Sequence, residues 1–104
     1  MSLPLIDPTV RAFPPIRAVA MERVKQDAKW GEQNHEDPCW LAILVEEVGE
    51  CAECVCKSSI GEPDADAEAY RDLLEYELIQ VAAVAVAWVE CIRRQNPSRH
   101  DNEG

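Results

Sequence analysis

Three glutamates, Glu46, Glu47 and Glu50, interrupt the apolar stretch "LAILVEEVGECA" of residues 41–52. Residues three or four apart share one face of a helix, so Glu47 and Glu50 are expected to point the same way, with Glu46 beside them. Carboxylates crowded among apolar side chains repel each other and lose hydration, which is costly unless a cation neutralises them. A cation site is one interpretation of the pattern, although this motif alone favours a simpler one. The simpler alternative is a solvated acidic stripe.

A second pair of oxygen-bearing side chains, Glu77 and Gln80, lies in "YELIQVAAV". These two residues are also three apart, and Glu77 interrupts a segment that otherwise has the composition of a helix core. Two helices that each offer such a pair could form one site for a hard cation, and Mg²⁺ prefers oxygen ligands in octahedral geometry. The second pair favours a metal site over a solvated stripe, with Mg²⁺ as the expected ion and Mn²⁺ as a substitute.

The elements that must position these groups are helical, and the sequence predicts an all-α fold. Residues 1–13 are expected to form an extended arm. Pro14-Pro15 is then expected to open a first helix, because proline is tolerated in a first turn. Residues four apart, namely Ile16, Ala20, Val24 and Ala28, would form its apolar face, and Gly31 would end it.

The two helices that carry the acidic pairs follow the loop "GEQNHEDP". Asp37 and Pro38 are expected as N-cap and first position of the second helix, which runs from about Cys39 to Lys57. Gly61 is expected to stop this helix, and Asp64 is a candidate cap for a third helix over roughly 65–95. The 104 residues suit a single domain over 1–104, with a polar tail over 97–104.

The most apolar segment of the chain, Val81–Val89, indicates how chains assemble. Every side chain in it is apolar, so a helix here must be covered on all sides. A buried strand is the alternative, but the helical sequence on both sides disfavours it. We therefore expect a bundle of about three to four helices per chain completed by dimerisation, in a homodimer or homotetramer.

Composition limits the partners and the compartment. Acidic residues outnumber basic ones 20 to 10, for a formal net charge of -10, which argues against nucleic acid or an anionic membrane surface as a partner. The N-terminus has no basic region typical of a signal peptide, and the longest apolar run is too short to span a bilayer. Five cysteines, three of them in Cys51-x-x-Cys54-x-Cys56, indicate a reducing cytoplasm and helix packing rather than a zinc site.

The two acidic motifs together resemble a known signature. "EEVGE" (residues 46–50) followed by "ELIQ" (residues 77–80) resembles the EExxE…ExxD motif of the MazG-like family of all-α nucleoside triphosphate pyrophosphohydrolases. The resemblance covers roughly residues 16–95 and includes "ERVKQDAKWGEQNH" ahead of the first motif. It implies Mg²⁺-dependent hydrolysis of an NTP or dNTP to the monophosphate and pyrophosphate, by a helical dimer or tetramer that cleans the nucleotide pool.

The resemblance also implies roles for individual residues. Glu46, Glu47, Glu50 and Glu77 would be the catalytic carboxylates, and Glu47, Glu50 and Glu77 would hold the metal. Gln80 stands where the family usually has aspartate, and it can offer a carbonyl oxygen but no charge. Its presence keeps open an alternative, a non-catalytic helical dimerisation or nucleotide-sensing module of the same fold.

Substrate contacts are expected from the first helix and the loop that follows it. Basic side chains would meet the phosphates, while aromatic and polar side chains would stack on the base and contact its edge. Surface charge and hydrophobic packing are the respective alternatives. The candidate residues are Arg23, Lys29, Trp30, Asn34, His35 and Trp40.

Overall fold

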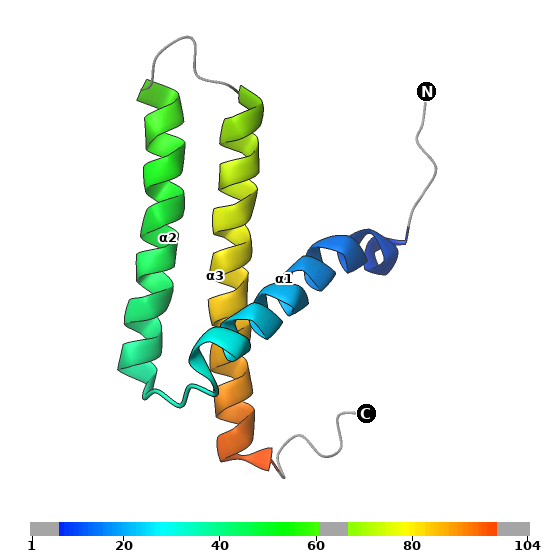
Figure 1. Cartoon of the computed structure of the whole chain (residues 1–104), viewed down its shortest axis with the longest axis vertical. Helices are drawn as coiled ribbons and strands as arrows, with labels where there is room; N and C mark the ends of the chain where they lie inside the picture. The colour runs from blue at the N-terminus through cyan, green and yellow to red at the C-terminus, as the bar shows by residue number, and fades with distance from the viewer. Residues whose placement is uncertain (1–6, 61–66, 98–104) are drawn as a thin grey trace.

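The structure, a computed structural model, describes residues 7–60 and 67–97, and this part of the chain forms three α-helices and no strand. They are α1 (Pro8–Trp30), α2 (Asp37–Ile60) and α3 (Ala67–Gln95). The predicted all-α fold is confirmed. In Figure 1, α2 and α3 lie side by side and antiparallel, while α1 crosses α3 and projects away from the hairpin. None of the three helices, over the residues described, combines the length and apolarity needed to cross a membrane.

The start of α1 corrects the predicted extended arm. The helix begins at Pro8, so residues 8–13 are helical, and only residues 1–6 fall outside the described part of the chain. The Asp7 side chain caps the helix by accepting a hydrogen bond from the Thr9 backbone N–H at 2.8 Å. A capping aspartate followed by proline at the first position is a strong start signal, and it lies upstream of Pro14-Pro15, which the helix incorporates.

The connection between α1 and α2 follows the prediction closely. Gly31 ends α1 with a positive φ of 72°, and its N–H donates to the Asp27 carbonyl at 2.8 Å. Asp37 is already the first residue of α2 rather than its cap, and its Oδ1 accepts a hydrogen bond from Trp88 Nε1 at 3.0 Å. The start of α2 is thereby tied to α3. The predicted stop and cap at Gly61 and Asp64 lie outside the described residues.

The predicted inner face of α1 is wrong. Ile16 and Val24 are 58% and 62% exposed, and the face turned toward α3 instead carries Arg23 and Gln26. Gln26 is only 9% exposed. Polar side chains occupy this face because each of the two finds a hydrogen-bond partner on α3.

The small core is centred on α3. Trp40 from α2 packs with Val84, Ala87 and Cys91 from α3, and Ile43, Leu44 and Trp88 surround them. Both α1 and α2 pack against α3, whereas their backbones do not approach each other. The core therefore joins α3 to the start of α2, close to the loop that follows α1.

A single chain does not cover its own apolar surface. Val86 and Val89 within the apolar segment of α3 remain 39% and 49% exposed. The outer face of α2 carries a stripe of apolar residues spaced alternately four and three apart, all of them exposed: Leu41, Val45, Val48, Ala52 and Val55. This spacing is the pattern of a helix that packs against another helix in a coiled-coil manner.

Candidate metal centre

Three carboxylates from two helices converge in the middle of the α2–α3 hairpin. Glu47 and Glu50 come from α2 and Glu77 from α3, and one ligand oxygen of each lies within 4.8 Å of the others. We call these three residues the carboxylate cluster. Spacing of three residues places the two α2 glutamates on the face that meets α3. Glu46 is exposed on α2 and contributes its charge to the surroundings of Glu47.

The electrostatics of the cluster are unfavourable for three separate negative charges. Burial raises the pKa of Glu47 above its ordinary value, and the charges of Glu50 and Glu77 raise it further. Burial likewise raises the pKa of Glu77, and the hydrogen bond with Glu50 and the charge of Glu50 raise it further. Glu77 Oε2 is buried and has no hydrogen-bond partner among the described residues.

These features fit a hard divalent cation. A buried carboxylate oxygen without a partner is costly, and a cation would both satisfy it and cancel the repulsion. Three carboxylates are the hard oxygen ligands that Mg²⁺ and Mn²⁺ accept. The neighbouring thiol of Cys51 is a poorer ligand, because burial and the charge of Glu77 raise its pKa and favour the protonated form.

Gln80, the fourth expected ligand, has a different partner. Its Oε1 accepts a hydrogen bond from Gln26 Nε2 on α1 at 3.5 Å, so the oxygen that a metal would need is engaged by α1. Its Nε2 is buried and has no hydrogen-bond partner within the described part of the chain. Among the described residues, the group that could hold a metal ion therefore consists of three carboxylates, Glu47, Glu50 and Glu77.

A cavity of about 210 Å³ adjoins the cluster through Glu47. All three helices and the loop before α2 contribute to its wall, which includes both predicted tryptophans, Trp30 and Trp40. We call it the tryptophan cavity. Aromatic and aliphatic side chains make most of its lining and glutamines add polar groups: Gln26, Trp30, Gln33, Trp40, Ile43, Glu47, Gln80, Val84 and Ala87. An apolar hollow with a few polar groups is typical of a small-molecule site.

A second hollow, of about 350 Å³, adjoins the other side of the cluster through Glu50 and Glu77. Its lining includes Lys57, whose Nζ lies 2.8 Å from Glu53 Oε1 in an exposed ion pair. The cluster thus adjoins both an aromatic cavity and a polar hollow, whose lining holds Glu50, Glu53 and Glu77 beside Lys57. With a divalent cation bound at the cluster to offset these carboxylates, the arrangement would suit a ligand with a ring at one end and anionic groups at the other.

The two basic residues predicted to bind phosphate lie elsewhere. Arg23 is only 13% exposed, and its guanidinium donates to both carboxylate oxygens of Glu90 on α3, at 2.8 and 3.1 Å. It also donates to Gln26 and Asp27. The Lys29 ammonium lies over the Trp30 ring, 4.8 Å from its centroid. Arg23 therefore joins α1 to α3 in this structure.

The two loop residues predicted to contact a base edge also have internal partners. Asn34 Oδ1 accepts hydrogen bonds from the Arg94 guanidinium at 3.0 and 3.1 Å, and Asn34 Nδ2 donates to Glu32. His35 packs edge-on against Trp40, with ring centroids 4.9 Å apart. Neither residue is among those that line the tryptophan cavity. Asn34 fastens the loop to the end of α3, and His35 supports one wall tryptophan.

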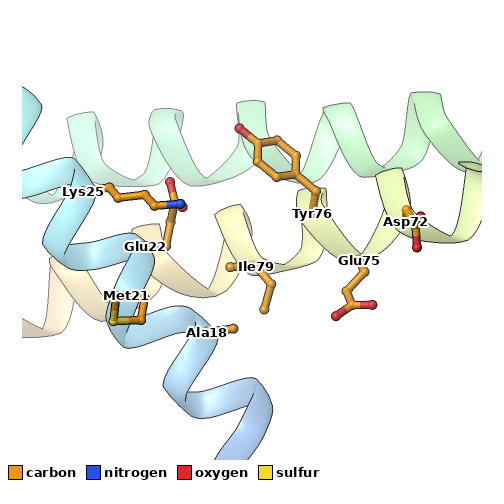
Figure 2. A pocket seen from close by; sticks show the side chains of 8 residues that line it. All are labelled: Ala18, Met21, Glu22, Lys25, Asp72, Glu75, Tyr76 and Ile79. Atoms are coloured by element: carbon orange, nitrogen blue, oxygen red, sulfur yellow. The ribbon is translucent and has the colours of Figure 1, made fainter.

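A larger groove of about 450 Å³ runs between α1 and the first half of α3 and excludes the cluster (Figure 2). Ala18 and Met21 from α1 and Ile79 from α3 form its apolar part, and Lys25 lies at the opposite end from Asp72. Acidic side chains outnumber basic ones in its lining. The negative charge of this groove therefore disfavours an anionic ligand. A carboxylate cluster that holds a metal ion would instead attract one.

Sequence reasoning missed two polar residues of the cavity wall, Gln26 and Gln33, of which Gln26 is the buried one. Gln26 lies three residues after Arg23, so the two polar side chains share a helix face. This face differs from the apolar face that the sequence predicted to be buried. No sequence signal indicated this, because the predicted apolar face of α1, with Ile16 and Val24, is exposed in the structure. Only the position of α3 shows that the polar face is the buried one.

Over the described residues, the chain is all-helical, and two antiparallel helices bring together three carboxylates that could hold a hard cation. Comparison with protein-family models, with curated proteins and with solved structures finds no match for this chain.

Proposed function

We propose that this protein is a Mg²⁺-dependent nucleoside triphosphate pyrophosphohydrolase of the MazG-like type. The observation that carries the proposal is the convergence of Glu47, Glu50 and Glu77 within 4.8 Å, beside an aromatic cavity and a hollow whose lining includes Lys57. The sequence resemblance of both acidic motifs supports the same conclusion. The reaction would take place in the cytoplasm, with Mn²⁺ as a possible substitute ion.

The residues of the cluster would act in two ways. Glu47, Glu50 and Glu77 would hold Mg²⁺, which when bound neutralises negative charge on phosphate oxygens. In the overall reaction, a water oxygen bonds to the α-phosphorus and the bond from that phosphorus to the bridging oxygen breaks. The proton of the water would pass to a carboxylate. Glu46, exposed on α2 next to Glu47, would orient or deprotonate that water.

The two hollows would divide the substrate between them. The base would enter the tryptophan cavity, where Trp30 and Trp40 form part of the wall. The phosphates would lie across the cluster toward Lys57, whose ion pair with Glu53 is exposed and therefore weak. Arg23 and Asn34 would act indirectly, by fixing α1 and the loop to α3.

We also propose that a second copy of the chain completes the bundle, as a homodimer or homotetramer. The four–three apolar stripe of α2 and the exposed Val86 and Val89 of α3 support this assembly. Burying such a stripe against a partner helix is favourable because apolar surface leaves water.

Pyrophosphate release from a panel of NTPs and dNTPs, with and without Mg²⁺, tests the activity. Glu50→Gln should abolish release while the protein stays folded. Glu75→Gln, at an exposed position of α3 outside the cluster and outside both adjoining hollows, should retain activity and serves as the matched control. Equal activity of wild type and Glu50→Gln would remove the cluster from the reaction, and no release from any nucleotide would refute hydrolysis.

The engagement of Gln80 by Gln26 favours one second candidate, a nucleotide-binding module that does not hydrolyse its ligand. Such a module would bind nucleotide and Mg²⁺ with the same residues. It would show saturable binding of a triphosphate by calorimetry and no pyrophosphate release over hours, whereas the enzyme would show both.

A further inference from the structure

The first half of α1 leaves its apolar side chains uncovered. We call residues 8–17 the projecting segment, and Figure 1 shows it pointing away from the α2–α3 hairpin. Val10, Phe13 and Ile16 in this segment are 55%, 63% and 58% exposed. Two prolines inside the helix remove backbone N–H donors here, which weakens its hydrogen bonding. A helical segment of this kind depends on packing for its stability, so we expect another surface to cover it.

The groove of Figure 2 offers a surface with matching properties. It lies between the second half of α1 and the first half of α3 and encloses about 450 Å³. Two large side chains in its lining are themselves exposed, Met21 by 52% and Tyr76 by 57%. Three acids, Glu22, Asp72 and Glu75, and a single base complete the charged part of the lining. The groove therefore fits a segment that is apolar and positively charged.

The projecting segment has the charge that the groove requires. Its only charged residues are Arg11 and Arg17, and α1 is the one described helix in which basic residues outnumber acidic ones, five to two. Two chains that each carry a net charge of -10 repel, unless their contact brings opposite charges together. Within one chain, the pair of Arg23 and Glu90 already joins basic α1 to acidic α3. A second copy could make the same kind of contact.

One face of α1 is self-complementary when two copies lie antiparallel. Arg11, Pro15, Ala18 and Glu22 are four, three and four positions apart, so they share this face, and Ala18 and Glu22 line the groove. The spacing is symmetric about its midpoint. Two such helices side by side and antiparallel therefore place Arg11 opposite the partner's Glu22, and Pro15 opposite the partner's Ala18. The compact side chains in the middle let the two helices approach closely.

We propose that two copies of the chain exchange their projecting segments, each docking in the groove of the other, with Arg11 paired to the partner's Glu22. A two-fold axis forms this ion pair twice, as in any contact where both subunits use the same patch. The contact is separate from the apolar stripe of α2, and it requires neither metal nor nucleotide. It therefore goes beyond the proposed function. The two contacts together would assemble four chains, which selects the tetramer from the two proposed assemblies.

Exchange of the two charges tests the contact by light scattering at micromolar concentration. Arg11→Glu and Glu22→Arg should each halve the mass of the assembly, because like charges then meet at both ends of the contact. The double variant Arg11→Glu/Glu22→Arg should recover the wild-type mass, since the pair is re-formed with its signs exchanged. Lys57→Glu makes the same change of charge on α2, outside the segment and the groove, and should keep the wild-type mass.

Cross-linking with a carbodiimide, which joins an amine directly to a carboxylate, keeps the test decisive if a charge variant fails to fold. In Arg11→Lys, mass spectrometry should find a link between position 11 and Glu22. These positions lie about 16 Å apart along one helix, so such a link can only join two copies. A monomeric wild type, an unchanged mass in Arg11→Glu, no recovery in the double variant, or a link from position 11 to α2 instead would overturn the inference. Pyrophosphate release by the wild type would still support the proposed function in each case.

Discussion

Replacing Glu77 by glutamine removes one charge from the carboxylate cluster while keeping the shape of the side chain. Glu77 Oε2 is buried without a hydrogen-bond partner, and Glu50 raises the pKa of Glu77 in addition to burial. In the absence of metal, the substitution therefore removes repulsion and desolvation, while the amide of the new glutamine can still donate a hydrogen bond to Glu50. We expect the metal-free variant to be more stable than the wild type.

The size of this effect follows from the separation of the charges. Two unit charges 4.8 Å apart repel by about 0.9 kcal/mol at the dielectric constant of water and by about 3.5 kcal/mol at an effective value of about 20. Glu50 is exposed to solvent, so the lower end applies. We expect the free energy of unfolding at pH 7 to rise by about 1 kcal/mol, which moves a thermal midpoint by several degrees.

Thermal unfolding with and without Mg²⁺ measures both parts of the prediction. Mg²⁺ should raise the midpoint of the wild type, because a ligand that binds only the folded state stabilises it. The same concentration should stabilise Glu77→Gln much less. Glu75→Gln changes the charge equally on an exposed position of the same helix, outside the cluster, and should respond to Mg²⁺ like the wild type.

Two outcomes would refute this reasoning. A metal-free Glu77→Gln variant less stable than the wild type would mean that the carboxylate is stabilised where it lies. Equal stabilisation of both proteins by Mg²⁺ would mean that the cluster does not hold the ion.

Three further measurements test other parts of the structure. The pKa of Glu77 is raised above its ordinary value of 4.5, so the protonated side chain favours the folded state. This stabilising contribution is fully present below pH 4.5 and is lost as the pH rises through the raised pKa. The advantage of Glu77→Gln over wild type in urea unfolding should therefore shrink toward zero between pH 7 and pH 4, and a constant advantage would contradict the shift. Arg23→Met should lower the free energy of unfolding by about 2 kcal/mol, since it leaves Glu90 and the buried Gln26 oxygen without their donor, while Lys29→Met should change it by less than about 0.5 kcal/mol. Light scattering should give a mass at least twice the 11.7 kDa of one chain, and a folded monomer at micromolar concentration would exclude the proposed assembly.

Local signals predicted three helices and the meeting of Glu47 and Glu50 with Glu77. Gly31 ended α1 as expected, because its positive φ is costly for other residues. The spacing of Glu47 and Glu50, together with an acid on the next helix, sufficed to predict convergence. A helical hairpin can bring two such faces together in few ways.

Partner choice between side chains could not be predicted in the same way. Arg23 and Asn34 had the chemistry to bind a phosphate and a base edge, but Glu90 and Arg94 lie within reach of them in the fold. Gln80 likewise could serve a metal or an amide, and Gln26 on a distant helix decides which. These contacts join residues more than fifty positions apart, so no local pattern contains them.

α3 is the only described helix that both of the others contact, and this has a consequence for how freely the sequence can vary. Ala83 is 0% exposed, so a larger side chain there would meet closely packed neighbours, and a larger side chain at Ala87 would extend into the core or into the tryptophan cavity. Exposed positions on the outer side of α1 can change without disturbing the hairpin. Across related chains, tolerance of substitution should therefore be lowest on α3 between Gln80 and Cys91, and variation should gather at exposed positions of α1 outside the face that carries Arg11 and Glu22.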